Sequence, residues 1–167
     1  RSTRVATSDG GVWVNNPKAT NAHAAAASWA ACDPVVWIAG GLSKGVDYDE
    51  LVRMHSARLR AVILIGTESA ALRGSLQRHA PDVPVIEPGT RQTEMVQRAG
   101  GGHIDGAAVM TWAVAAAAGI ALGGDTVLMA PASASMDQFS SYAHRGDAFI
   151  SAVRGLVEGQ AKAGKEF

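Results

Sequence analysis

Short apolar runs separated by turn-forming residues recur along the chain and predict β-strands. Residues 35–39 and 61–65 are the clearest, because they are rich in β-branched and aliphatic side chains and each ends at a glycine. Apolar runs without an alternating polar face are typical of strands that are buried on both faces of a sheet. About six strands are expected, at residues 4–6, 12–14, 35–39, 61–65, 83–86 and 126–129.

Helix-compatible stretches fill most of the intervals between these runs. Alternation of strands and helices predicts an α/β fold in three layers, with a mostly parallel sheet covered by helices on both faces. The first two strands flank Asp9-Gly10-Gly11, a tight-turn sequence, so they are expected to form a hairpin with one antiparallel edge strand. The expected helices are residues 20–31, 48–56, 69–79, 107–121 and 147–161.

Composition narrows the class of protein. A chain of 167 residues suits one domain, residues 1–167, and its 15 basic and 15 acidic residues give no net charge for nucleic acid or anionic lipid. The single cysteine excludes an internal disulfide and fits the cytoplasm. The apolar stretch 107–122 is shorter than the ~20 residues that cross a bilayer. We expect a cytoplasmic monomer without nucleic-acid or membrane partners and, since its histidines are scattered, without a metal site.

Three polar loops follow predicted strands, where α/β sheets gather their ligands. One holds Lys18 and Thr20, the next holds Gly40-Gly41 and Lys44, and the third runs from Ala130 through Ser135. Lysines, hydroxyls and helix-start N–H groups at one edge of a sheet suit a small dicarboxylate, and glycines let backbone approach a ligand closely. Each loop also has a plainer interpretation, namely a helix cap, a solvated lysine or a simple strand-to-helix connection with Ser135 as N-cap.

Known nucleotide-binding signatures are missing from these loops. The Gly-Gly segment before Lys44 lacks the spacing of a phosphate loop, and no Gly-x-Gly-x-x-Gly follows a strand. A second block of residues after the serine-rich turn, Arg145 to Phe149, has no role in a simple connection. We interpret Arg145 and Asp147 as a pair that could lock the last helix against the loop that contains Ser135.

Taken together, these segments resemble the C-terminal domain of the D-glutamate-adding Mur ligases over essentially the whole chain. The resemblance rests on Lys18-Ala19-Thr20-Asn21, on Ala39-Gly40-Gly41 with Lys44, and on Ala130-Pro131-Ala132 through Ser135-Met136-Asp137-Gln138-Phe139 with Arg145-Gly146-Asp147-Ala148-Phe149. It implies a Rossmann-like domain, the third of three, with the N-terminal UDP-binding and central ATPase domains absent from this chain.

The resemblance also implies a function in peptidoglycan precursor synthesis. Such enzymes use ATP and Mg²⁺, bound mainly by the central domain, to convert UDP-N-acetylmuramoyl-L-alanine into an acyl phosphate that the amine of D-glutamate attacks. This chain would position D-glutamate and close over the active site, and it would be inactive alone. Its expected partners are D-glutamate directly, and ATP and UDP-N-acetylmuramoyl-L-alanine through the other domains.

Roles for single residues follow from the same resemblance. Thr20 and Lys44 are expected at the D-glutamate carboxylates, and Ser135 at the side-chain carboxylate together with the backbone of Met136 and Tyr142. Tyr142 stands where the family commonly has phenylalanine.

The loop before Thr20 is expected to face the reaction centre. Lys18 is expected to be catalytic and close to the nucleotide. Asn16 is also expected near the nucleotide, although the family usually has aspartate at this position.

A different class of function remains open on the residues alone. A free-standing flavodoxin-like or receiver-like module that binds a small anion or a protein partner would also place polar loops at the carboxyl ends of its strands.

Overall fold

The computed structural model describes residues 2–9, 11–89 and 105–165, and its strands form one mixed sheet. The strand order is β1-β2-β6-β3-β4-β5, with β1 antiparallel to β2 and every other neighbouring pair parallel. All six expected strands are present, and the antiparallel edge strand is confirmed. Their bounds are Thr3–Ser8 (β1), Gly11–Asn15 (β2), Val35–Gly40 (β3), Leu59–Ile65 (β4), Val85–Ile86 (β5) and Thr126–Met129 (β6).

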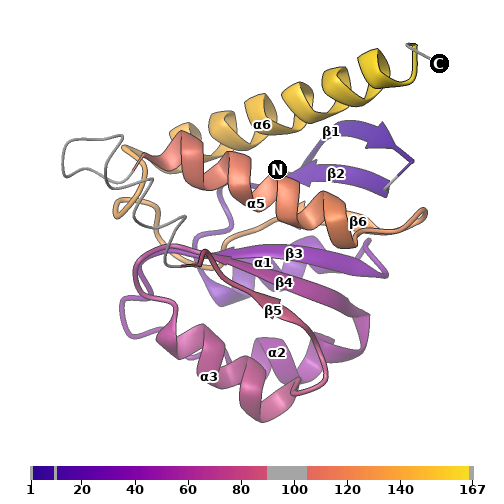
Figure 1. Ribbon diagram of the computed structural model, residues 1–167. Coiled ribbons are helices and arrows are strands. Elements are labelled where there is room, and N and C mark those ends of the chain that lie inside the picture. Colours follow the sequence, from indigo (N-terminus) through magenta and orange to yellow (C-terminus); the bar gives the residue numbers. More distant parts are fainter. Residues whose placement is uncertain (1, 10, 90–104, 166–167) are drawn as a thin grey trace.

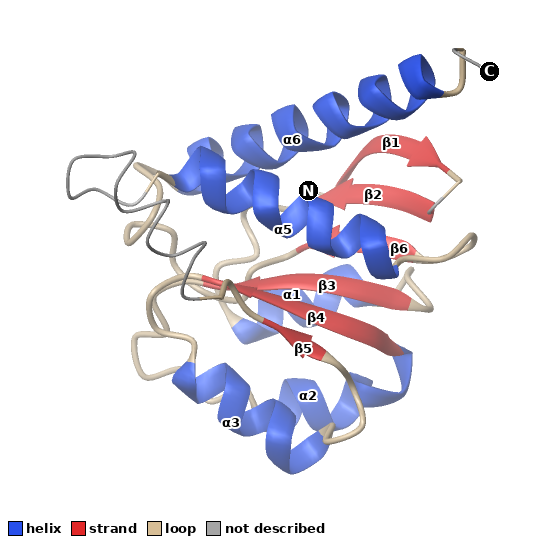
Figure 2. Cartoon of the chain, in the orientation of Figure 1, coloured by secondary structure: helices blue, strands red, loops and turns tan. Residues whose placement is uncertain are grey.

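Helices cover both faces of this sheet, which confirms the expected three-layer α/β fold (Figures 1 and 2). The helices α1, α2 and α3 lie on one face, and α5 and α6 lie on the other. Their bounds are Ala22–Trp29 (α1), Asp49–His55 (α2), Ala70–His79 (α3), Gly106–Ile120 (α5) and Tyr142–Ala163 (α6), and a short 3-10 turn at Ser56–Arg58 follows α2. No described helix is both long and apolar enough to cross a membrane.

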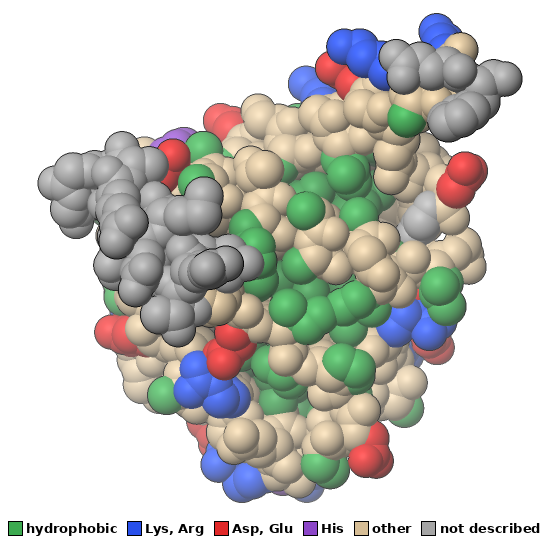
Figure 3. Space-filling model, viewed as in Figure 1, with side chains coloured by type: hydrophobic (Ala, Val, Ile, Leu, Met, Phe, Trp, Pro, Cys, Tyr) green, Lys and Arg blue, Asp and Glu red, His purple; other side chains and the backbone are tan. Residues whose placement is uncertain are grey.

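Two cores result, because the central strands direct alternate side chains to opposite faces. On β3, Trp37 belongs to the core under α1 to α3, where its ring meets that of Trp29 edge-on at 4.7 Å. Its neighbour Ile38 belongs to the core under α5 and α6, where Trp13 packs against Phe149. Figure 3 shows hydrophobic side chains gathered over α5 in the middle of this second face.

The position of β6 sets up the site. Leu128 on β6 lies opposite Val14 on β2 and opposite Trp37 on β3, so this late strand is inserted between two early ones. The loop that leaves the carboxyl end of β6 is therefore flanked by the loops that leave β2 and β3.

The amino ends of the strands are held by a separate cluster. Arg60 on β4 forms a salt bridge with the buried carboxylate of Asp125, which also accepts a 2.9 Å hydrogen bond from the backbone of Leu122. This cluster stabilises the sheet at the edge opposite to the polar loops.

Candidate functional site

Backbone hydrogen bonds join the three predicted loops at the carboxyl edge of the sheet. The amide of Ala132 after β6 donates to the carbonyl of Ala19 after β2 at 2.7 Å. On the other side, Leu42 after β3 and Ala134 exchange two hydrogen bonds of 2.9 and 3.1 Å. The loop after β6 is thus attached to both neighbours, and the loops that carry Lys18, Lys44 and Ser135 form one surface.

The glycines of this region serve close backbone packing. A Cβ at Gly41, whose φ is 143°, would lie 2.1 Å from the carbonyl oxygen of Ala134. One at Gly66, with a φ of 91°, would lie 2.2 Å from the amide nitrogen of Gly41. Only glycine fits at these positions, because the neighbouring loop occupies the space of a side chain. The sequence interpretation assigned Gly40 and Gly41 to the approach of a ligand and missed this packing role.

The loop after β2 presents two of the predicted residues. Lys18 is exposed, and its Nζ lies 6.0 Å from the centre of the Tyr142 ring. The N-cap of α1 is Asn21, whose side chain accepts a 2.8 Å hydrogen bond from the amide of Ala24. Asn21, and not Thr20, is therefore the residue that caps α1.

Asn16 turns towards α1. Its side-chain amide donates to the hydroxyl of Ser28 on that helix, and its backbone amide donates to the carbonyl of Met129 at 2.8 Å. These bonds attach the start of the loop to the sheet and to α1.

Lys44 lies in the loop after β3 with an exposed side chain and a φ of 48°. Its neighbour Ser43 donates from both its amide and its hydroxyl to Oε2 of Glu68, each at 3.1 Å. Glu68 belongs to the loop after β4, which the sequence analysis did not include. Neither Lys18 nor Lys44 forms an ion pair with a described residue, so both charges are free to meet an anion.

The serine-rich segment differs from the expectation. Ser135 is buried, 4% exposed, and its carbonyl accepts from Phe139 at 3.0 Å, so it begins a tight turn and does not cap a helix. The last helix begins five residues earlier than predicted, at Tyr142, and its N-cap is Ser141, which accepts from the amide of His144 at 3.0 Å. The predicted helix N-terminus at Ser135 is therefore wrong.

Contacts with the loop after β4 explain this difference. The carboxylate of Asp137 accepts from the amide of Thr67 at 2.8 Å, and the side-chain carbonyl of Gln138 accepts from the amide of Gly66 at 2.9 Å. These bonds across the sheet edge hold the segment as a turn. They leave Met136 65% exposed, and Tyr142 is 43% exposed at the start of α6.

A buried polar layer includes Ser133. Its hydroxyl lies 2.6 Å from the hydroxyl of Tyr48, and burial raises the pKa of Tyr48. Its carbonyl accepts a 3.0 Å hydrogen bond from Arg145, which is 1% exposed. A second N–H of Arg145 donates to the carbonyl of Pro17 at 3.4 Å. Burial lowers the pKa of Arg145 to about 10, although the charge of Asp137 acts in the opposite direction.

This arrangement corrects the predicted pair of Arg145 and Asp147. Arg145 does hold α6 against the loop, but through carbonyl groups, whereas Asp147 is exposed on the helix. The sequence near Arg145 does not reveal its carbonyl partners, and the sequence near Ser43 does not reveal Glu68. These contacts depend on the order of the strands in the sheet.

Chemically, the site can bind and orient an anion. In the described ranges, no group of three His, Cys, Asp or Glu residues could hold a metal ion, and the full sequence has no phosphate loop. Lysine ammonium groups and a serine hydroxyl fit carboxylates well.

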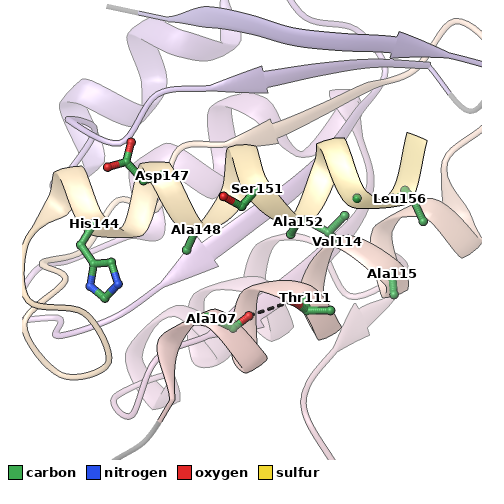
Figure 4. Close-up of a pocket in the computed structure, with 11 residues that line it drawn as sticks. Ala107, Thr111, Val114, Ala115, His144, Asp147, Ala148, Ser151, Ala152 and Leu156 are labelled. Carbon is green, nitrogen blue, oxygen red and sulfur yellow. Dashed lines mark hydrogen bonds between the residues drawn. The ribbon is translucent and has the colours of Figure 1, made fainter. Parts of the chain in front are cut away.

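A separate groove of about 510 Å³ lies between α5 and α6 (Figure 4). Small and apolar side chains such as Ala115 and Ala152 line most of it, with His144 and Asp147 near the start of α6. None of the predicted site residues lines this groove.

The sheet order and the helices on both of its faces define a Rossmann-like α/β domain. No family model matches the chain. Individual relatives do: a protein from Mycolicibacterium vanbaalenii is 48% identical over 94% of this chain, one from Streptomyces avermitilis 49% over 93%, and one from Thermobifida fusca 51% over 94%.

All three are named UDP-N-acetylmuramoylalanine–D-glutamate ligase. The chain is therefore homologous to a segment of the D-glutamate-adding Mur ligases, which confirms the resemblance. It spans only about a third of these relatives, since the aligned part is 35%, 30% and 31% of their lengths. That share is consistent with a C-terminal domain.

Proposed function

We propose that this chain is the C-terminal domain of an ATP-dependent ligase that adds D-glutamate to UDP-N-acetylmuramoyl-L-alanine in cytoplasmic peptidoglycan precursor synthesis. Two observations together support the proposal. The loops with Lys18, Lys44 and Ser135 are joined at one edge of the sheet, and the chain is about half identical to proteins named as these ligases. The N-terminal UDP-binding domain and the central ATPase domain lie outside this chain in the proposal.

D-glutamate binds between the three loops in this account. Lys44 and Thr20 contact its carboxylates, and Ser135 with the backbone of Met136 and Tyr142 receives the side-chain carboxylate. Charge-assisted hydrogen bonds from lysine to carboxylate are stronger than neutral ones, so the two ends of the amino acid are fixed separately. Fixing both ends orients the free amine, which is how such a site lowers the barrier.

In this account, the chemical step takes place close to Lys18. In the whole enzyme, ATP with Mg²⁺ would be held mainly by the central domain and would supply the phosphoryl group for an acyl phosphate of the substrate carboxylate, with ADP as the leaving group. The amine of D-glutamate would then attack the acyl carbon, so that a C–N bond forms, the C–O bond to phosphate breaks, inorganic phosphate leaves and the proton of the amine passes to solvent. The charge of Lys18 stabilises the developing anion at this centre, and Asn16 lies on the nucleotide side of the loop.

Substitution in the full-length enzyme tests the assignment. Lys44→Ala and Ser135→Ala are expected to reduce kcat/KM for D-glutamate by about 100-fold or more, because each removes one end of the carboxylate clamp. Lys162→Ala is the matched control, since it removes an exposed lysine from the last turn of α6. Full D-glutamate use by a Lys44→Ala, Ser135→Ala enzyme would overturn the proposal.

A further inference from the structure

Arg145 connects the two loops that hold opposite ends of the proposed substrate. Its guanidinium donates to Pro17, which immediately precedes Lys18, and to Ser133, which is two residues before Ser135. The contacts span residues 128 and 12 positions away in the chain, so no local structure fixes this geometry. A planar guanidinium with several donors in a fixed fork is suited to setting the distance between two carbonyl groups.

The energetic position of Arg145 argues against a purely structural role. It is 1% exposed, it forms no salt bridge with a described residue, and its Nε has no hydrogen-bond partner among the described residues. A buried cation without a paired carboxylate is costly, and an apolar side chain of similar volume would often be more stable. The charge of Asp137 offsets only part of this cost.

An anion bound at the loops of Lys18 and Ser135 would offset the cost of burying the charge of Arg145. A carboxylate bound beside the loop of Ser133 would interact favourably with the buried charge of Arg145, since the protein interior screens it less than water does. The same side chain would keep the loops at the spacing that the ligand requires.

We infer that Arg145 is a positioning residue for D-glutamate, which fixes the loop of Lys18 and Thr20 against the loop of Ser135 without touching the substrate. The inference rests on the proposed function, because it assumes that D-glutamate binds at these loops. Its role is specific to one substrate: ATP and the UDP-linked substrate are bound mainly by other domains in that proposal.

Steady-state kinetics of the full-length enzyme test the inference. Arg145→Met keeps an unbranched apolar stem but removes the donors and the charge, and it is expected to raise KM for D-glutamate about tenfold or more. KM for ATP and for the UDP-linked substrate is expected to change by less than about twofold. A purely structural loss would instead reduce the amount of active enzyme, and therefore kcat, and leave all three KM values unchanged.

Two further variants make the test decisive. Arg145→Lys keeps the charge but has only a point donor that cannot span both carbonyl groups, so KM for D-glutamate is expected to rise by about threefold or more, less than in Arg145→Met. Arg60→Met breaks the salt bridge with Asp125 at the opposite edge of the sheet and is the control. It is expected to lower stability and to leave KM for D-glutamate within about twofold.

These experiments distinguish a failure of the proposed function from a failure of the inference on Arg145. If the unmodified enzyme does not use D-glutamate, the proposed function is wrong. If it does, and KM for D-glutamate is unchanged in Arg145→Lys, the inference on Arg145 is overturned even where Arg145→Met fails to fold.

Discussion

A hydrogen bond between Tyr48, the N-cap residue of α2, and Ser133 connects this helix to the candidate site. Their hydroxyl groups lie 2.6 Å apart in the buried layer beneath the loop after β6. Tyr48→Phe leaves the Ser133 hydroxyl without this partner, so the free energy of unfolding of the chain is expected to fall by about 1 to 2 kcal/mol in urea titration.

A double variant provides the control for this prediction. Tyr48→Phe with Ser133→Ala removes both polar groups and is expected to regain part of the loss, because no unsatisfied hydroxyl remains. Equal stability of the unmodified chain and Tyr48→Phe would show that the hydrogen bond contributes nothing.

Titration of His55 gives a prediction for the effect of pH on stability. Its ring meets that of Trp29 at 5.0 Å, and burial, with the charge of Arg58, lowers its pKa below the usual value of 6.5. The unfolded chain therefore takes up this proton before the folded chain does, and stability is lost as pH falls below 6.5.

The variant His55→Phe keeps an aromatic ring but cannot take up a proton. Between about pH 7 and about pH 5.5, its urea midpoint is expected to fall less than that of the unmodified chain. Identical pH profiles would contradict the assigned pKa shift.

At the scale of elements, a serine that caps α6 can be compared with a serine inside the same helix. Ser141 caps the helix, so Ser141→Ala is expected to lower the free energy of unfolding by about 1 kcal/mol. In the full-length enzyme, KM for D-glutamate should stay unchanged, because Ser141 is not part of the proposed clamp.

The control for this prediction is Ser151→Ala, because Ser151 is an exposed serine within the same helix. This substitution should not lower the free energy of unfolding, since alanine is the better helix former. A stable Ser141→Ala chain would place the N-cap elsewhere.

The strands could be predicted well because their signal is local. β3 is apolar throughout and β4 is apolar from Ala61 to Ile65, and such runs are typical of strands that are buried on both faces of a sheet. The turn at Ser135 could not be predicted, because Ser135 and Asp137 have the composition of a helix N-terminus. What decides the outcome is the hydrogen bond from Thr67 to Asp137, which depends on the position of β4 in the sheet.

The candidate site shows the same division. Lys18, Lys44 and Ser135 could be selected from the sequence because polar loops after strands meet at one edge of a parallel sheet. Glu68 and the carbonyl partners of Arg145 could not, because their contacts cross between loops that are distant in the chain.

At the scale of the whole molecule, the chain supplies one side of the proposed reaction. Its site suits the amino acid, whereas the chemistry of ATP is assigned to segments outside it. The chain alone is therefore expected to show no ATP turnover in the presence of both substrates, measured as phosphate release. Measurable turnover by the chain alone would contradict this division of labour.

The central claim is that this domain positions D-glutamate for amide formation. The most direct measurement supplies the full-length enzyme with ATP and UDP-N-acetylmuramoyl-L-alanine, and compares phosphate release with D-glutamate and with L-glutamate. The account predicts phosphate release and an amide product with D-glutamate, and little of either with L-glutamate or with the Lys44→Ala enzyme. Equal turnover with both enantiomers, or none with D-glutamate, would contradict it.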